Sequence, residues 1–293
     1  MENALQRFLF EHVNIRGELV SLDSSWRHVL ERRTYPNSVK RLLGEVTAAT
    51  VLLAATIKLD GTLSIQIKGH SALQLLFAET IGSTSFRSTA KWNEHEEMNL
   101  ENINLLSGGS IAVTITPKTS GQPYQGLVQV QSESIQESLE NYMGQSEQLP
   151  TRLWLASNDQ KASGMLLQKL PGKDNIESDD WQRINTLAST ITDKELLSLD
   201  FDTILKRLFH EETVRLFDDS HLSFMCSCSE NRTDGMLQSL GEAEVRSILS
   251  EKGNVNITCE FCGKNYIYAL PGIDRIFSGQ SSDPIQDFHG SIN

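Results

Sequence analysis

Alternating apolar and polar residues mark several strands in the first part of the chain. Leu63–Ile67 (LSIQI) and Ile111–Ile115 (IAVTI) carry an apolar side chain at every second position, and Val128–Val130 and Leu153–Leu155 repeat this pattern. Because successive side chains of a strand point to opposite faces, this period is typical of half-buried strands. The sequence therefore predicts a sheet-containing region over the first ~170 residues.

Two helices are predicted among these strands. One covers residues 38–58 and contains the apolar run 46–57 (VTAATVLLAATI), which is shorter than the roughly 20 residues needed to cross a bilayer and so indicates a buried helix. The second starts at Ser134, where Ser134 and Glu137 fit a capping box. Its apolar face would consist of Ile135, Leu139, Tyr142 and Met143. Strands and helices together predict an α+β core domain over residues 1–173.

Residues 174–225 have a different pattern, with two apolar stripes at helical spacing. The stripes are Trp181, Ile184, Leu187 and Ile191, and then Phe201, Ile204, Leu205, Leu208 and Phe209. The segment holds five Lys or Arg against twelve Asp or Glu, which is more than half of the chain's net charge of -12. Short helices with such self-repulsion should keep their fold only while docked on another surface. We predict an acidic helical linker here; a solvated linker of no special meaning is the alternative.

All four cysteines of the chain lie in two close pairs in its last quarter. The pairs are Cys226-Ser-Cys228 and Cys259-Glu-Phe-Cys262. Four thiolates can enclose one Zn²⁺ tetrahedrally, and the same thiols can form two disulfides when an oxidant arrives. The first pair is CxC rather than CxxC, and the 30-residue spacer exceeds the usual ~15–20. Neither feature excludes a zinc module over residues 226–278, in which the metal is either purely structural or redox-responsive.

The residues around the second pair predict a hairpin. Val255 and Ile257 alternate into Cys259, and Tyr266-Ile-Tyr268 leads away from Cys262. Helix is predicted around Leu237, Leu240, Ile248 and Leu249. Because about sixty residues form only a small hydrophobic core, we expect a bound metal ion to stabilise this module. The remaining residues, 279–293, are predicted to be disordered.

Charge and missing motifs exclude several functions. The acidic balance argues against nucleic acid and against an anionic membrane surface as partners. The amino terminus lacks a signal-peptide pattern, so we expect a cytoplasmic protein, where paired cysteines are more often metal ligands or catalytic thiols than structural disulfides. The sequence has no nucleotide-binding, serine-hydrolase or metalloprotease motif, and we expect no enzyme.

Two alternative functions stay open at this point. A thiol–disulfide oxidoreductase would use Cys259 and Cys262, and it would need its CxxC at a helix N-terminus to lower a thiol pKa. A zinc-ribbon adaptor with purely structural zinc would need a basic, aromatic-rich module. The predicted hairpin and the acidic chain disfavour both.

Several longer stretches carry a resemblance to a known family over nearly the whole chain. They are AATVLLAATIKLDG (48–61), SEQLPT (146–151), LLQKLP (166–171), LKRLFHEE (205–212), CSCSE (226–230) and CEFCGKNY (259–266). The chain resembles the redox-regulated 33 kDa heat-shock chaperones of bacteria. The CxC–CxxC arrangement is that family's zinc signature, so Cys226, Cys228, Cys259 and Cys262 carry over as the ligands of one zinc ion.

The resemblance implies an ATP-independent holdase. The reduced, zinc-bound form would be inactive, and oxidative stress would form the disulfides Cys226–Cys228 and Cys259–Cys262 and release zinc. Module and linker would then unfold and hold unfolded or oxidatively damaged client proteins, with formation of a homodimer. Leu205, Leu208 and Phe209 are our candidates for client contact.

Overall fold

The protein is described here by a computed structural model that covers residues 2–57, 60–69, 72–95, 104–119, 121–130, 134–171 and 179–278. The chain divides into two compact units, residues 1–226 and 227–293. The predicted tail, residues 279–293, lies outside the described residues.

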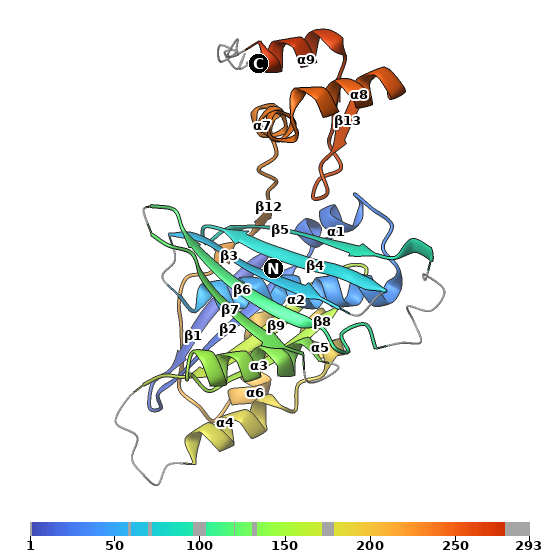
Figure 1. The fold of residues 1–293 in the computed structure, drawn as a ribbon. Coiled ribbons are helices and arrows are strands. Elements are labelled where there is room, and N and C mark those ends of the chain that lie inside the picture. Colours follow the sequence, from blue (N-terminus) through green and yellow to red (C-terminus); the bar gives the residue numbers. More distant parts are fainter. Residues whose placement is uncertain are drawn as a thin grey trace, which may run out of the picture. The chain divides into compact units, whose positions relative to one another are not determined.

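Two sheets form the framework of the first unit (Figure 1). Sheet A has the strand order β10-β1-β2-β9-β8, with β11 also paired to β1, and sheet B has the order β12-β5-β4-β3-β6-β7. Every strand pair is antiparallel except β12 with β5. The strands of sheet A are β1 (Ala4–Phe10), β2 (Ile15–Leu22), β8 (Thr151–Ser157), β9 (Ala162–Lys169), β10 (Val214–Leu216) and β11 (Ser220–His221). Those of sheet B are β3 (Gly61–Lys68), β4 (Leu73–Ile81), β5 (Ser85–Trp92), β6 (Ser110–Pro117), β7 (Tyr124–Gln129) and β12 (Ser223–Phe224).

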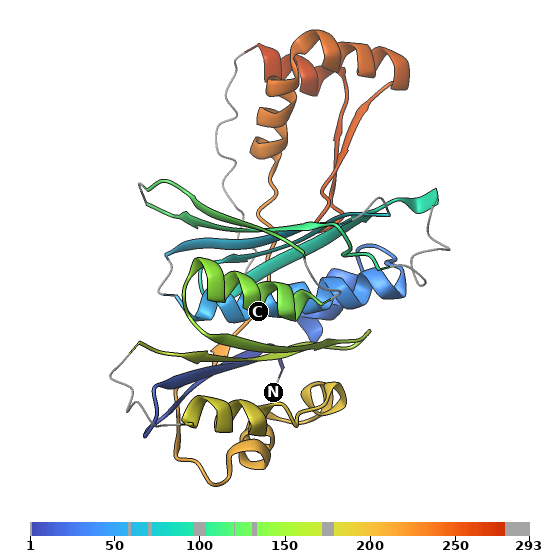
Figure 2. The same ribbon diagram turned by 60° about the horizontal axis from the view of Figure 1, so that its bottom comes forward.

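Helix α2 (Asn37–Ala55) lies between the two sheets, as Figure 2 shows. It contacts β2, β8 and β9 of sheet A and β3, β4 and β5 of sheet B, so its residues 42–53 are buried on every side. This explains why the sequence of this helix is apolar all round rather than striped. Helix α3 (Ile135–Ser146) packs against β7, β8 and α2, and α1 (Ser24–Leu30) packs against β5 and β12.

Three short helices cover the other face of sheet A. They are α4 (Asp180–Ala188), α5 (Asp193–Ser198) and α6 (Phe201–Phe209). Their apolar side chains form one buried cluster with residues of β1, β2, β8 and β9, which explains why β2 and β9 are buried on both faces. At its centre Phe209 contacts Phe10 edge-to-face, with ring centroids 5.0 Å apart.

A segment of very short strands then follows the edges of both sheets. We call residues 213–225 the edge-strand segment. Its β10 and β11 pair with β1 of sheet A, and its β12 pairs with β5 of sheet B. Additional backbone bonds run from Phe217 N to Arg7 O (3.0 Å) and from Met225 N to Phe86 O (2.9 Å). The segment is therefore bonded to both sheets up to the residue before Cys226.

The described part of the second unit, residues 227–278, consists of three helices and a hairpin. These are α7 (Glu230–Leu240), α8 (Glu242–Lys252), α9 (Leu270–Phe277) and the strands β13 (Val255–Thr258) and β14 (Asn265–Tyr268). Seven residues form its buried core: Leu237, Val245, Val255, Tyr266, Tyr268, Ile273 and Ile276. Such a small core needs a second source of stability.

The predicted α+β class is confirmed, and the differences from the predicted elements are local. Helix α2 ends at Ala55, and the turn at 56–57 follows it. The predicted helix around Leu237–Leu249 is two helices, because Gly241 (φ +95°) interrupts it in a conformation that favours glycine. Leu240 consequently lies at a helix end and is 53% exposed rather than part of the core. The predicted cap at Ser134 is confirmed, since its side chain accepts from Glu137 N, and a complete capping box lies at Thr192 and Glu195.

Candidate metal centre

The first cysteine pair lies between two elements that fix its position. Cys226 directly follows the edge-strand segment, and Cys228 precedes Ser229, the N-cap of α7. The Ser229 hydroxyl accepts a hydrogen bond from the backbone N–H of Arg232 (3.3 Å), which is the usual role of serine at this position. Only Ser227 separates the two cysteines. The end of the edge-strand segment and the start of α7 therefore hold both thiols close together.

The second pair lies in the turn between β13 and β14, which confirms the predicted hairpin. Cys259 N donates to Lys264 O (2.9 Å), and Gly263 N donates to Cys259 O (2.8 Å). Gly263 has φ +68°, a left-handed conformation that other residues rarely adopt. The backbone therefore closes tightly around Cys259 and Cys262, and their side chains leave the same turn. This CxxC is not at a helix N-terminus, where an oxidoreductase would place it.

All four sulfurs converge in one cluster. The Sγ atoms of Cys226, Cys228, Cys259 and Cys262 lie within 4.8 Å of one another, and Cys228 Sγ is 3.3 Å from Cys262 Sγ. A tetrahedral zinc site with Zn–S bonds of about 2.3 Å has its sulfurs about 3.8 Å apart. Four half-buried thiols at this spacing fit such a site, and a set of only sulfur ligands suits Zn²⁺ rather than Mg²⁺ or Ca²⁺. The cluster could hold a metal ion.

The surroundings of the cluster connect it to the small core of the second unit. Tyr266, which belongs to that core, lies beside the cysteines, and the Cys228 sulfur raises the pKa of its phenol. Cys228 itself packs against this core. Near it, the Tyr268 hydroxyl donates to Asp234 Oδ1 (2.8 Å), and Arg275 pairs with Glu230 and Asp234. Cys228 and Tyr266 thus connect the cysteine cluster to the core of this unit. The sequence marked Tyr266 as a strand residue and gave no sign of its place beside the thiols.

The three candidate client-contact residues are buried. Leu205, Leu208 and Phe209 of α6 are 6%, 3% and 2% exposed, and they belong to the cluster that packs on sheet A. They therefore pack among residues of sheet A rather than facing solvent.

Other expectations concern partners and membranes. The described part of the second unit, residues 227–278, has five Lys or Arg and seven Asp or Glu, a balance that does not favour nucleic acid. Among the described residues, no helix is both long and apolar enough to span a bilayer.

Comparison with known proteins gives one consistent result. The family model "Hsp33 protein" matches residues 3–269. The chain is 43% identical over 274 residues to the 33 kDa chaperonin of Chromobacterium violaceum, with 93% of each chain covered. It is 42% identical over 286 residues to the 33 kDa chaperonin of Methylobacillus flagellatus, with 97% of each covered. A 33 kDa chaperonin crystal structure from Thermotoga maritima shares the fold, with TM-score 0.80, 16% identity and coverage of 94% of this chain and 97% of that one. Family model, relatives and fold agree over nearly the whole length, and the chain belongs to the Hsp33 family of chaperones.

Proposed function

We propose that this chaperone is a redox-regulated, ATP-independent holdase, inactive when its four cysteines are reduced and hold one Zn²⁺. The observation that carries the proposal is the convergence of all four thiols at the end of the edge-strand segment. Bound zinc would keep the cysteines as thiolates, the form that oxidants attack, and would contribute an apparent ~10–16 kcal/mol to the folding of a small module. Stability of the second unit would then depend on the oxidation state of the thiols.

The chemical step requires an oxidant of the peroxide class. Each pair of thiolates gives up two electrons to one H₂O₂, which takes up two protons from solvent; one S–S bond and two water molecules form, and the Zn²⁺ loses these ligands. By the family resemblance the pairs are Cys226–Cys228 and Cys259–Cys262. A sulfur in a disulfide is no longer a thiolate ligand, so oxidation removes the metal site. The cytoplasm, where we place this protein, normally keeps thiols reduced, so oxidation there would signal stress.

The response to oxidation would come from residues 174–225. Helices α4, α5 and α6 have nine, six and nine residues, too few to be stable alone, and the segment carries a strong excess of negative charge. Its apolar contacts with sheet A therefore have to hold it in place. Once Cys226 is released from the metal site, the edge-strand segment loses its anchor at one end, and undocking becomes easier.

Undocking would expose apolar surface on both partners. Leu205, Leu208 and Phe209 would become accessible, and so would the residues of β1, β2 and β9 beneath them. A large exposed apolar surface is what unfolded and oxidatively damaged client proteins bind, and it also favours a homodimer. No step in this sequence needs nucleotide hydrolysis.

Light scattering of thermally unfolding citrate synthase tests the proposal directly. The full chain is added either reduced and zinc-loaded or after treatment with peroxide at mildly raised temperature. Suppression of scattering by the oxidised form alone is the expected result. Equal suppression by both forms, or by neither, would contradict the redox switch and leave the cysteines with a purely structural metal.

Limited proteolysis of the same two samples tests the structural part. We expect residues 174–278 to become sensitive after oxidation while the rest of the first unit survives. Equal resistance in both samples would contradict undocking of the linker, whatever the scattering assay gives.

A further inference from the structure

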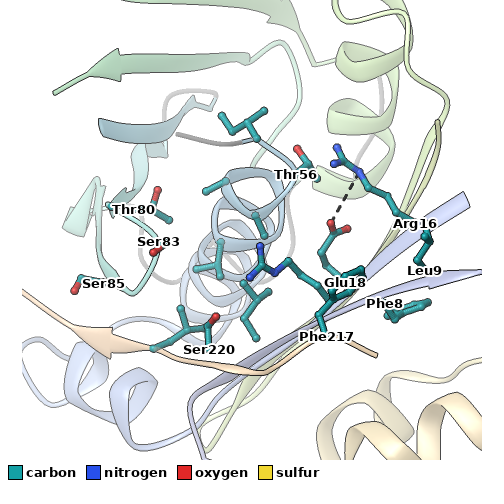
Figure 3. Close-up of a pocket in the computed structure, with 18 of the residues that line it drawn as sticks. Phe8, Leu9, Arg16, Glu18, Thr56, Thr80, Ser83, Ser85, Phe217 and Ser220 are labelled. Atoms are coloured by element: carbon teal, nitrogen blue, oxygen red, sulfur yellow. Dashed lines mark ion pairs between the residues drawn. The ribbon is translucent and has the colours of Figure 1, made fainter. Parts of the chain in front are cut away.

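A cavity of about 660 Å³ lies in the first unit, at the C-terminal end of α2. Its volume is in the range of small-molecule sites. Strands β1 and β2 supply one wall, the β4–β5 hairpin the opposite wall, and the edge-strand segment a third side. Figure 3 shows Glu18 and Arg16 on one side of this space and Thr80, Ser83 and Ser85 on the other.

The wall formed by β1 and β2 contains a buried carboxyl group, and one oxygen of this group lacks a hydrogen-bond partner among the described residues. Glu18 is 2% exposed, and its Oε2 has no hydrogen-bond partner among the described residues. Its Oε1 is 4.0 Å from Arg16 Nε, an ion-pair distance but too long for a hydrogen bond. Arg16 instead donates to Gln168 Oε1 from Nε (3.1 Å) and from Nη2 (2.5 Å). A buried polar atom without a partner is costly, so one left at the wall of a cavity indicates a missing ligand group.

A second cation lies on the same wall. Arg7 of β1 is exposed, lines the cavity and acts electrostatically on Glu18. Within the described residues its guanidinium forms no ion pair or hydrogen bond of its own. It therefore has all its donors available for a ligand.

The rest of the lining is mainly apolar. Apolar residues of β1, of α2 and the turn after it, and of the edge-strand segment contribute to it: Leu5, Val51, Ala54, Ala55, Ile57 and Leu222. A ligand that fills this space thus needs an apolar body and one polar end.

We propose that the cavity is a binding site for a small amphipathic carboxylic acid, whose carboxylate lies between Arg7 and Glu18 and whose apolar chain lies against the end of α2. Arg7 would hold the carboxylate by charge-assisted hydrogen bonds. Glu18 in its neutral form would donate its proton to the same group and so satisfy the atom that lacks a partner.

The charges around the site favour a single negative charge on the ligand. The charged side chains that line the cavity are Arg7, Arg16, Glu18 and Asp60. When Glu18 is neutral, the net charge of these four side chains is +1, which one carboxylate balances. The two negative charges of a phosphate dianion would exceed this positive charge, and a protonated amine would be repelled by the two arginines.

The protonation state of Glu18 makes binding depend on pH. Burial raises the pKa of Glu18 to about 7, against the opposing effect of Arg16 and Arg7. Below that pH the neutral acid can donate, whereas above it two carboxylates would repel each other. The ligand's own carboxyl group, with a pKa of about 4–5, stays ionised throughout. We therefore expect the affinity to fall as pH rises through 7, by at most about tenfold per pH unit.

The site also includes part of the linker. Phe217, Ser220 and Leu222 of the edge-strand segment line the cavity, together with strands of both sheets. A ligand that contacts all three sides binds only while the segment is docked, so it would stabilise the docked form by mass action. This consequence rests on the proposed function, whereas the binding site itself does not.

Calorimetric titration of the reduced, zinc-loaded full chain with decanoate tests the site. We expect saturable 1:1 binding, and no binding of decylamine. Arg7→Gln should weaken binding at least about tenfold, while the matched control Arg32→Gln, which removes an exposed charge outside the cavity, should not. Glu18→Gln, which keeps a donor, should still bind and should lose the pH dependence. Ala55→Phe, which fills the cavity, should abolish binding.

Several outcomes would overturn the proposal. They are absence of decanoate binding, equal weakening by both arginine variants, tighter binding of decylamine than of decanoate, or loss of decanoate binding in Glu18→Gln with an unchanged melting temperature. A separate readout concerns the coupling: proteolysis of residues 213–225 after peroxide treatment should slow when decanoate is present. Binding without this protection would leave the site intact and contradict only its link to linker docking.

Discussion

Replacing Phe209 by alanine should activate the chaperone without any oxidant. Phe209 is 2% exposed in α6, and its ring meets Phe10 at 5.0 Å and Phe8 at 6.3 Å between centroids. Truncating a buried phenylalanine costs about 3–5 kcal/mol, which includes the loss of these aromatic contacts. Because Phe209 belongs to the linker and its partners to β1, most of this cost falls on docking.

The magnitude decides the expected result. A loss of about 4 kcal/mol changes the docking equilibrium by a factor of about 10³. Three such short helices are not stable alone, so their packing on sheet A supplies most of the free energy that keeps them docked. We therefore expect the reduced, zinc-loaded Phe209→Ala variant to suppress client aggregation and to lose protease resistance over residues 179–225.

Leu216→Ala serves as the matched control. Leu216 lies in the same part of the chain, but it is 45% exposed, so its truncation should cost less than about 1 kcal/mol and leave the reduced protein inactive. Zinc content and the melting temperature of both variants are measured alongside. A folded, zinc-loaded Phe209→Ala protein that stays inactive and protease-resistant when reduced would refute the view that linker docking controls activity.

Three further perturbations address the metal centre and a second buried carboxylate. Cys259→Ser should lower zinc content and make residues 227–278 protease-sensitive, because three thiolates remain; full zinc content measured by a chelator assay would contradict the four-thiolate site. Gly263→Val should weaken zinc retention in the same assay, since φ +68° is strained for a branched residue, and unchanged retention would show that the turn is not needed. Burial raises the pKa of Glu45 to about 7 despite its ion pair with Arg41 at 2.8 Å. A raised carboxyl pKa means that the folded protein binds the extra proton, so the stabilising contribution is complete below about pH 4.5 and is lost as pH rises through about 7. Denaturant titrations should therefore find that Glu45→Gln gains about 2–3 kcal/mol relative to the unmodified chain between about pH 5 and about pH 8, and a constant difference would disprove the shift.

The cysteine cluster and the α+β class could be predicted because their signals are local. Two close cysteine pairs need only a turn and a helix start to converge, and alternation into Cys259 already indicates the hairpin. The same holds for α6, whose stripe from Phe201 to Phe209 has one buried face. The apolar run in α2 indicated burial, although the two sheets that bury it were not evident from the run itself.

The edge-strand segment and the cavity could not be predicted in this way. Strands of two or three residues, such as β11 and β12, are too short to have a period, and their pairing depends on partners far away in the sequence. Glu18 is a single acidic residue within a strand. The residues next to it in the sequence do not indicate that both faces of β2 are covered by other parts of the protein. Whether such a residue is buried depends on packing with elements far away in the sequence, and the local pattern of apolar and polar residues carries no information about that packing.

The two sheets differ in when they can form during synthesis. In sheet B, β3, β4 and β5 are hairpin neighbours, and β6 and β7 follow soon after. In sheet A, β2 (Ile15–Leu22) pairs with β9 (Ala162–Lys169), and β1 (Ala4–Phe10) pairs with β2 on one side and with β10 (Val214–Leu216) on the other. Strands β1 and β2 can pair with each other at once, but their other partners, β10 and β9, are made much later, and such distant pairing slows folding. For that interval the apolar side chains of β1 and β2 are themselves exposed, so a newly made chain of this chaperone passes through the kind of state that it protects in other proteins.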